Sequence, residues 1–218
     1  MRGNESWLPA AALWDLDGTI VDTEPLWIAA EYDLAERHDA PWTIEDAMHV
    51  VGSDLIDSGR YIRERMGLDL TPHEIVDDLI AGVLRQLDGD IAWRPGALEL
   101  LGRLRDAGVP LALVTMSWRS IVDALLPHLP DGIFDIVVTG DEVEPGKPHP
   151  EPYLAAARAL GVDPSSCIAF EDSPTGAKSA EAAGCHVVVV AHHVPVPGSG
   201  RRTLVESLVD LDFSRIDS

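Results

Sequence analysis

Five short apolar runs constrain the fold of this chain more than any other feature of its sequence. Each is four to six residues long and mostly apolar, without regular polar alternation, which is typical of strands in a sheet buried on both faces. Helix-like stretches separate most of them, so the pattern predicts an α/β core in which helices cover a parallel sheet. The runs are Ala10–Trp14, Val109–Val114, Phe134–Val138, Cys167–Phe170 and His186–Val190. The helical stretches are Gly96–Ala107, Pro152–Ala159 and Gly176–Ala183, and their ends are marked by Gly108, Gly161 and Gly184.

A different pattern occupies the chain between the first two apolar runs. Apolar residues recur here at helical spacing, turns are marked by proline and glycine, and no strand-like run interrupts them. The helical segments are Leu26–Leu34, Ala47–Val51, Leu55–Met66 and Ile75–Leu87. We therefore predict a core domain formed by residues 1–22 and 93–218, and an all-helical cap formed by residues 23–92.

The net charge excludes some classes of partner. The 218 residues include 16 basic and 37 acidic ones, so the formal charge is −21, which argues against a nucleic-acid binder or a protein of anionic membrane surfaces. An anionic substrate would need a local cation, and a divalent metal ion is the simplest choice. We expect Cys167 and Cys185 to be reduced core residues. Without an evident signal peptide or membrane-length apolar run, we expect a cytoplasmic protein, monomeric by default.

Two carboxylates follow the first predicted strand. Asp15 and Asp17 flank Leu16, and Gly18 allows a sharp turn directly after them. Side chains at i and i+2 of an extended segment point to the same side. At the carboxyl end of a parallel strand they face the crevice in which α/β proteins bind ligands. A polar loop with an Asx-type turn would explain the isolated pair equally well.

Three further strands are followed by chemically useful side chains. Thr115 could bind a phosphate oxygen, although Thr115 or Ser117 could instead cap the next helix. Lys147, in a loop stiffened by prolines, could be a fixed positive charge or an ordinary surface lysine. Glu171 and Asp172 suit a hard cation such as Mg²⁺, or could belong to a capping box of the following helix. Because a parallel sheet brings all these groups to one edge, together they predict a phosphate site with a metal ion.

The order of these motifs resembles that of the haloacid-dehalogenase-like hydrolases. The similar subgroup has a helical cap after the first strand and includes phosphoglycolate phosphatases, sugar-phosphate phosphatases and β-phosphoglucomutases. The matching segments are spread over the whole chain at the expected spacing. They are Asp15–Pro25, Thr115, Gly146–Pro148 and Phe170–Gly176. The resemblance implies a Rossmann-like core, a helical cap and Mg²⁺-dependent phosphoryl transfer.

The resemblance also implies a role for each catalytic position. Asp15 would attack phosphorus and form an aspartyl-phosphate, a step that needs neighbouring positive charge because a carboxylate is a poor nucleophile for an anion. Asp17 would protonate the leaving alkoxide and then activate water. Thr115 and Lys147 would bind the transferring phosphoryl oxygens, and Ser117 would be a further substrate contact.

The metal site and the cap follow from the same resemblance. Asp15 and Asp172 would hold Mg²⁺ together with the backbone carbonyl of Asp17, and Glu171 would be a direct or indirect partner of the ion. Gly52 would lie on a cap loop that faces the active site and contacts substrate. Cap residues that could set specificity, unless packing or a solvated helix face explains them, are Trp27, His49, Arg60 and Arg63. The paired residues His192 and His193 have no metal-ligand spacing, and we expect them in a solvated loop.

The sequence favours hydrolysis over isomerisation. Thr19 resembles the phosphatase form of the first motif, where β-phosphoglucomutases usually carry valine. The mutases also place an arginine shortly after the glycine that corresponds to Gly52, whereas this chain has Ser53-Asp54-Leu55. We expect a phosphatase acting on a small phosphomonoester such as a sugar phosphate, and keep a β-phosphoglucomutase-like mutase as the alternative. Signalling receiver domains combine similar side chains, but they lack the helical insertion.

Overall fold

The apolar runs form the strands of one parallel sheet. The structure, a computed structural model, describes residues 8–51, 53–87, 91–190, 192, 194–209 and 211. The strand order is β3-β2-β1-β4-β5-β6, and every neighbouring pair is parallel. The strands are β1 (Ala11–Trp14), β2 (Leu111–Val114), β3 (Ile136–Val138), β4 (Cys167–Glu171), β5 (His186–Val190) and β6 (Arg202–Val205). The predicted α/β core with a parallel sheet is confirmed.

The register of the central strands places their carboxyl ends side by side. Trp14 at the end of β1 lies opposite Leu113 of β2 and Phe170 of β4. The Asp15 amide then donates a hydrogen bond to the Phe170 carbonyl at 3.0 Å, which continues the pairing by one residue. Because these three strands are parallel and in this register, the residues that follow them emerge at one edge of the sheet.

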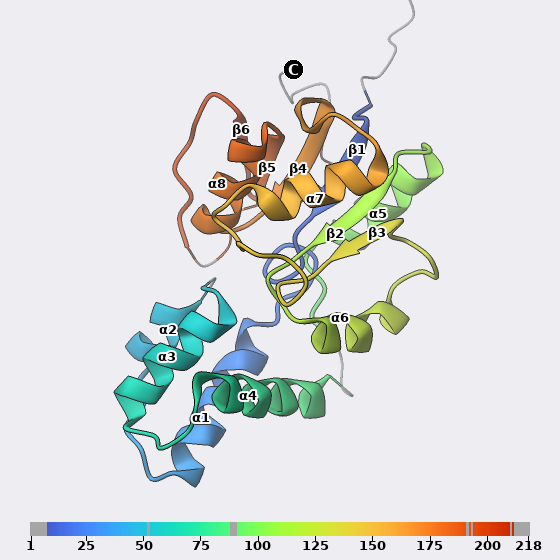
Figure 1. Cartoon of the computed structure of the whole chain (residues 1–218). Coiled ribbons are helices and arrows are strands. Elements are labelled where there is room, and N and C mark those ends of the chain that lie inside the picture. The colour runs from blue at the N-terminus through green and yellow to red at the C-terminus, as the bar shows by residue number, and fades with distance from the viewer. Residues whose placement is uncertain are drawn as a thin grey trace, which may run out of the picture.

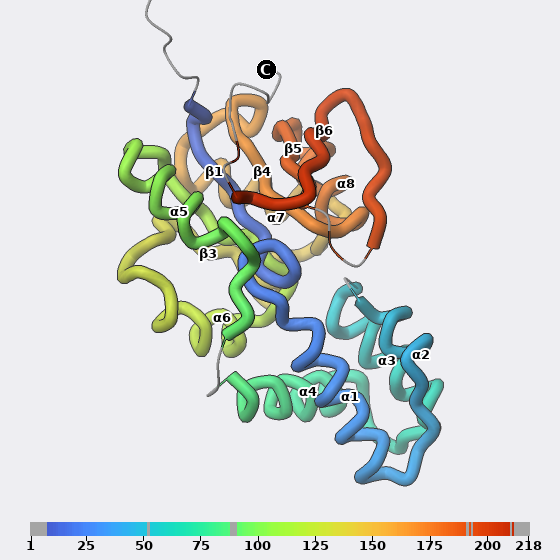
Figure 2. Tube along the Cα trace, turned by 180° about the vertical axis from the view of Figure 1, so that it is seen from behind, coloured from blue at the N-terminus to red at the C-terminus, as the bar shows by residue number. Residues whose placement is uncertain are grey.

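Helices cover both faces of the sheet (Figures 1 and 2). Helices α7 (Glu151–Leu160) and α8 (Pro174–Ala183) lie on one face, and α5 (Ala97–Asp106) and α6 (Arg119–Leu125) lie on the other. Leu13 packs with the first pair of helices, whereas Trp14 faces the second pair and stacks on Phe170 with ring centroids 4.0 Å apart. Both faces are therefore buried, which explains why the strands lack polar alternation. Short 3₁₀ turns follow at Leu126–His128 and Pro164–Ser166.

Four helices between β1 and α5 form a separate group below the sheet in Figure 1. The helices are α1 (Glu24–Arg37), α2 (Ile44–Val50), α3 (Leu55–Met66) and α4 (Pro72–Gln86). Helix α4 packs against α1 and α3, and it also contacts α6 of the core. Capping boxes begin α2 at Thr43 and α4 at Thr71, which satisfies amides that the first turn leaves without partners. These helices occupy the segment for which we predicted a cap.

The chain leaves and re-enters the core through two adjacent segments. The Asp22 amide donates to the Ala92 carbonyl at 2.8 Å, and the Arg94 amide donates to the Ile20 carbonyl at 2.8 Å. This pairing is consistent with the predicted boundaries at residues 22 and 93, which remain a prediction. Among the described residues, no helix is both long enough and apolar enough to cross a membrane.

Two features differ from the sequence analysis. Strand β6 was not predicted, because Arg202–Val205 is a short segment of mixed polarity at an edge of the sheet. The expectation that His192 is solvated is wrong: its side chain is only 6% exposed, with Nε2 3.5 Å from Asp22 Oδ1. The loop after β5 lies against the loop after β1, a contact that local sequence does not encode. His193 lies outside the described residues. Cys167 and Cys185 are buried and unbonded, as expected.

Candidate active site

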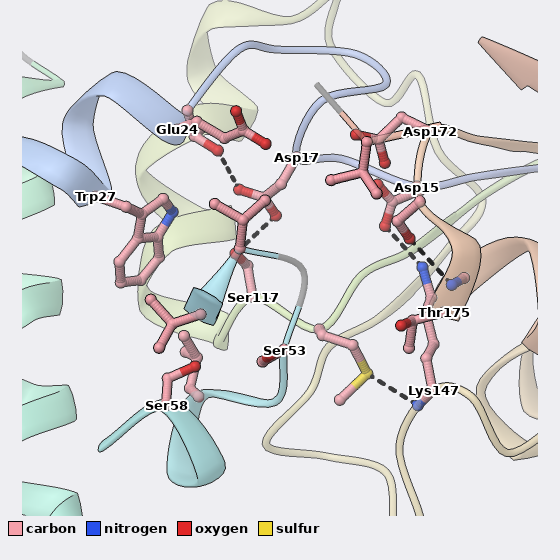
Figure 3. A pocket seen from close by; sticks show the side chains of 18 of the residues that line it. Asp15, Asp17, Glu24, Trp27, Ser53, Ser58, Ser117, Lys147, Asp172 and Thr175 are labelled. Atoms are coloured by element: carbon pink, nitrogen blue, oxygen red, sulfur yellow. Dashed lines mark hydrogen bonds and ion pairs between the residues drawn. The ribbon is translucent and has the colours of Figure 1, made fainter. Parts of the chain in front are cut away.

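A cavity of about 270 Å³ lies between the carboxyl edge of the sheet and the cap helices (Figure 3). The core contributes charged and polar side chains to its wall, and α1 to α4 contribute mainly apolar ones. Core residues that line the cavity include Asp15, Asp17, Ser117, Lys147 and Asp172. The carboxylates, lysine and serine that the sequence placed at separate strand ends therefore meet in one cavity.

The centre of the site is a buried lysine between two carboxylates. Lys147 Nζ donates hydrogen bonds to Asp15 Oδ1 at 2.7 Å and to Glu171 Oε1 at 2.6 Å, and the lysine side chain is only 4% exposed. Burial lowers the pKa of Lys147, but the charges of Asp15 and Glu171 outweigh it and hold this pKa above its usual value. The ammonium group is therefore a fixed positive charge, and the reading of Lys147 as an ordinary surface lysine is wrong.

Three acidic residues crowd together beside this ammonium group. Ligand oxygens of Asp15, Glu171 and Asp172 all lie within 4.8 Å of one another. Burial raises the pKa of Asp15, opposed by Lys147 and reinforced by Glu171, and burial together with Asp15 and Glu171 raises the pKa of Asp172. One ammonium group does not balance three carboxylates. Since Mg²⁺ prefers carboxylate oxygens, this donor set suits such an ion.

Glu171 occupies a different position from the other two acids. Its side chain is fully buried, and Oε1 accepts from Tyr153 Oη at 2.5 Å as well as from Lys147, while Oε2 accepts from Ser173 Oγ at 3.3 Å. Both oxygens are thus used within the protein, which suits a residue that positions Lys147. Our sequence analysis missed Tyr153. A tyrosine on the buried face of the helix after the lysine loop was the available signal, because buried hydroxyls need partners.

Asp17 lies on the cap side of the acidic cluster. Its carboxylate accepts hydrogen bonds from three hydroxyls: Thr23 Oγ1 on Oδ1, and Thr115 Oγ1 at 3.1 Å and Ser117 Oγ at 2.8 Å on Oδ2. The structure thus joins Thr115 and Ser117 to the site through Asp17, and their contact with a phosphate remains a prediction. Thr23 is a second residue that sequence analysis missed, although it lies within the Asp15–Pro25 motif.

The alternative helix-capping roles are not observed. Helix α6 begins after Trp118 without a side-chain cap, so neither Thr115 nor Ser117 caps it. Helix α8 is capped by the Ser173 hydroxyl, which accepts from the Gly176 amide at 3.0 Å, and not by Glu171 or Asp172. The two acidic side chains are thereby left for the site.

Two glycines allow the acids to approach the backbone closely. A Cβ on Gly18 would lie 2.0 Å from Asp172 Oδ2, and the φ of +80° at Gly18 itself disfavours other residues. A Cβ on Gly176 would lie 1.9 Å from Glu171 Oε1. Any side chain at either position would displace a carboxylate of the cluster.

The predicted cap contacts divide into three groups. Trp27 of α1 lines the cavity, so packing within the cap alone does not explain the position of this side chain. His49, Arg60 and Arg63 are exposed and do not line it. Gly52 lies outside the described residues, so the structure says nothing about its contact with substrate.

Comparison with known proteins finds similar sequences and structures over most of this chain. The family model for haloacid dehalogenase-like hydrolases matches residues 9–184. The protein CbbY of Rhodobacter capsulatus is 35% identical over 193 residues, which cover 82% of this chain and 84% of CbbY. Hexitol phosphatase A of Escherichia coli is 35% identical over 186 residues, covering 82% and 81%. A CbbY variant from Rhodobacter sphaeroides, crystallised with xylulose-1,5-bisphosphate, superimposes with a TM-score of 0.81 at 26% identity, covering 94% and 96%.

Proposed function

The chain belongs to the haloacid dehalogenase-like hydrolase family, and we propose that it is a Mg²⁺-dependent phosphatase that hydrolyses a small phosphomonoester through an aspartyl-phosphate. One observation carries this proposal. Asp15 lines the cavity, and its Oδ1 lies 2.7 Å from the buried ammonium group of Lys147. Asp172, another acid of the cluster, lies beside it. Relatives named as phosphatases support the same reaction class.

In the first step, an Asp15 carboxylate oxygen attacks phosphorus. The bond between phosphorus and the ester oxygen breaks, and its electron pair stays on the leaving alkoxide. Lys147 reduces the repulsion between the carboxylate and the anionic phosphoryl group, because its ammonium group is held between Asp15 and Glu171 before substrate arrives. Asp17, on the cap side where the leaving group must lie, gives the alkoxide a proton.

In the second step, water attacks the phosphorus of the aspartyl-phosphate. Asp17 takes a proton from this water, the bond between phosphorus and the Asp15 oxygen breaks, and inorganic phosphate leaves. Thr23, Thr115 and Ser117 fix the orientation of Asp17 through their hydroxyls. A proton donor held in this way is directed towards the cavity for both steps.

We propose that Asp15 and Asp172 hold the metal ion with the backbone carbonyl of Asp17, and that Glu171 acts indirectly by positioning Lys147. When bound, Mg²⁺ supplies positive charge that offsets the negative charge on the phosphoryl oxygens. The crowding of Asp15, Glu171 and Asp172 around one ammonium group supports this assignment.

The test is a phosphate-release assay over a panel of phosphomonoesters. We expect turnover with Mg²⁺, loss of turnover with EDTA, and a fall in kcat of at least about 10³-fold in Asp15→Asn, because the amide cannot form the aspartyl-phosphate. Asp131→Asn, at an exposed position, is the matched control and should retain activity. An active Asp15→Asn enzyme would contradict the proposal. Conversion of a hexose 1-phosphate into its 6-phosphate without phosphate release would instead favour the mutase alternative.

A further inference from the structure

We propose that the cavity selects a monophosphate ester of a compact, uncharged and largely apolar alcohol, and that it discriminates against substrates with a second phosphate. This inference rests on the proposed phosphatase function and concerns the leaving group. It follows from two properties of the cavity wall: the placement of its charges and the chemistry of its cap side.

The charges of the wall favour one phosphate only. Among the described residues that line the cavity, Lys147 is the single basic side chain, and it already donates to Asp15 and Glu171. The α1 side of the wall contributes two carboxyl groups, Glu24 and the buried Glu31, and no basic side chain. A second phosphate extending from the site towards the cap would lose its water and meet no positive partner, which is strongly unfavourable for a buried anion.

The cap side of the wall is apolar. Its apolar residues are Trp27, Ile28, Val50, Val51, Leu55 and Leu79. In Figure 3 Trp27 lies on the side of the cavity away from Lys147. An apolar leaving group would bury its surface against these side chains, a contact that is favourable in proportion to the area removed from water.

Two polar groups of the cap side already have hydrogen-bond partners. The Ser58 hydroxyl donates to the Asp54 carbonyl at 3.0 Å, and the Glu31 carboxyl accepts from the Trp42 indole at 3.2 Å. A polyhydroxylated leaving group would therefore give up hydrogen bonds to water and find few replacements, which costs binding free energy for each hydroxyl. The volume of about 270 Å³ is at the small end for a ligand site, so the alcohol must be compact.

These properties differ from what a bisphosphate requires. The CbbY variant of Rhodobacter sphaeroides was crystallised with xylulose-1,5-bisphosphate. In this chain, the described part of the cavity provides no second cation that could receive the distal phosphate of such a ligand. Although the two proteins share a family and a fold, we therefore do not expect this chain to act on that bisphosphate.

The test compares three compounds that each carry a primary alkyl phosphate on a six-membered ring, and it follows hydrolysis at that phosphate by identifying the product. Glucose 6-phosphate differs from cyclohexylmethyl phosphate by its ring oxygen and hydroxyls, and glucose 1,6-bisphosphate adds a second phosphate. We expect kcat/KM to fall at least about 10-fold at each of these two steps. Equal values, or a higher value for either glucose ester, would overturn the inference.

A pair of variants tests the apolar wall directly. Trp27→Ala should lower the preference for cyclohexylmethyl phosphate over glucose 6-phosphate several-fold, whereas Trp27→Phe should largely preserve it. An equal loss of kcat/KM on both substrates would indicate that Trp27 has only a structural role. It would contradict a contact between Trp27 and the leaving group.

The outcome separates this inference from the proposed function. With 4-nitrophenyl phosphate as a general substrate, absence of Mg²⁺-dependent phosphate release would refute the phosphatase itself. Release that depends on Asp15, combined with a preference for the bisphosphate, would refute only the inference about the leaving group.

Discussion

The two ends of the cavity are built on opposite physical principles. At the core end, buried charges face one another at hydrogen-bond distance, with Lys147 Nζ 2.7 Å from Asp15 and 2.6 Å from Glu171. At the cap end, side chains such as Trp27 and Leu79 make a mainly apolar wall. The side chains of the core end are held by hydrogen bonds and ion pairs to one another, so we expect a substitution of any one of them to disrupt the whole site. The cap end depends on shape and apolar area, so single substitutions can change what it binds.

One residue does not fit this division. Glu31 of α1 is 4% exposed in the cap, and its carboxyl group accepts a hydrogen bond from the Trp42 indole. Burial raises the pKa of Glu31 to about 8, opposed by the hydrogen bond from Trp42. At neutral pH this carboxyl is therefore largely protonated, and its hydrogen-bond donor is a neutral indole, whereas Asp15 at the core end accepts from the ammonium group of Lys147. The comparison can be tested from both sides.

The largest effect should follow the removal of the ammonium group at the core end. Lys147→Met leaves Asp15 and Glu171 buried without their cation, so we expect near-complete loss of phosphate release and a loss of about 3–5 kcal/mol in the free energy of unfolding. Urea unfolding and the activity assay measure both. Lys178→Met, at the chain's only other lysine and exposed on α8, is the control. A Lys147→Met enzyme with nearly normal turnover would contradict the role of this charge.

A smaller effect, visible only in its dependence on pH, should follow from Glu31→Gln at the cap end. Because the folded-state pKa of Glu31 is about 8 against an ordinary value of 4.5, unfolding releases a proton between these values. The stabilising contribution of Glu31 is thus present below pH 4.5 and is lost as pH rises towards 8. We expect wild type to lose on the order of 4 kcal/mol relative to Glu31→Gln over this range. If the free energy of unfolding depends on pH in the same way in both proteins, Glu31 is not buried as described.

The smallest effect should follow the removal of the hydroxyl that donates to Glu171 at the core end. Tyr153→Phe removes one donor to Glu171 but leaves Lys147 in place. We expect a loss of about 1 kcal/mol in unfolding free energy and a fall in kcat of several-fold with KM little changed, since Glu171 would hold the ammonium group less firmly. A change in KM alone would place Tyr153 in substrate binding instead.

The structural features that local sequence encodes were predicted best. The five apolar runs became β1 to β5, and Leu55–Met66 is helix α3 with the predicted bounds. Asp15, Lys147 and Asp172 could be assigned to one site before any coordinates, because parallel strands bring their carboxyl ends to one edge. Strand β6 was missed because an edge strand is not buried on both faces and need not be a continuous apolar run.

The sequence by itself determined the first five strands, most of the helices between them, the helical insertion and the set of side chains at the strand ends. These features depend on hydrophobic periodicity and turn residues within a few positions of one another. Only the tertiary structure decided that Tyr153 supports Glu171, that His192 lies against Asp22, and that Trp27 rather than Arg60 faces the cavity. Such contacts join segments that are distant in the chain, and they depend on how whole helices and loops pack, which local patterns do not encode.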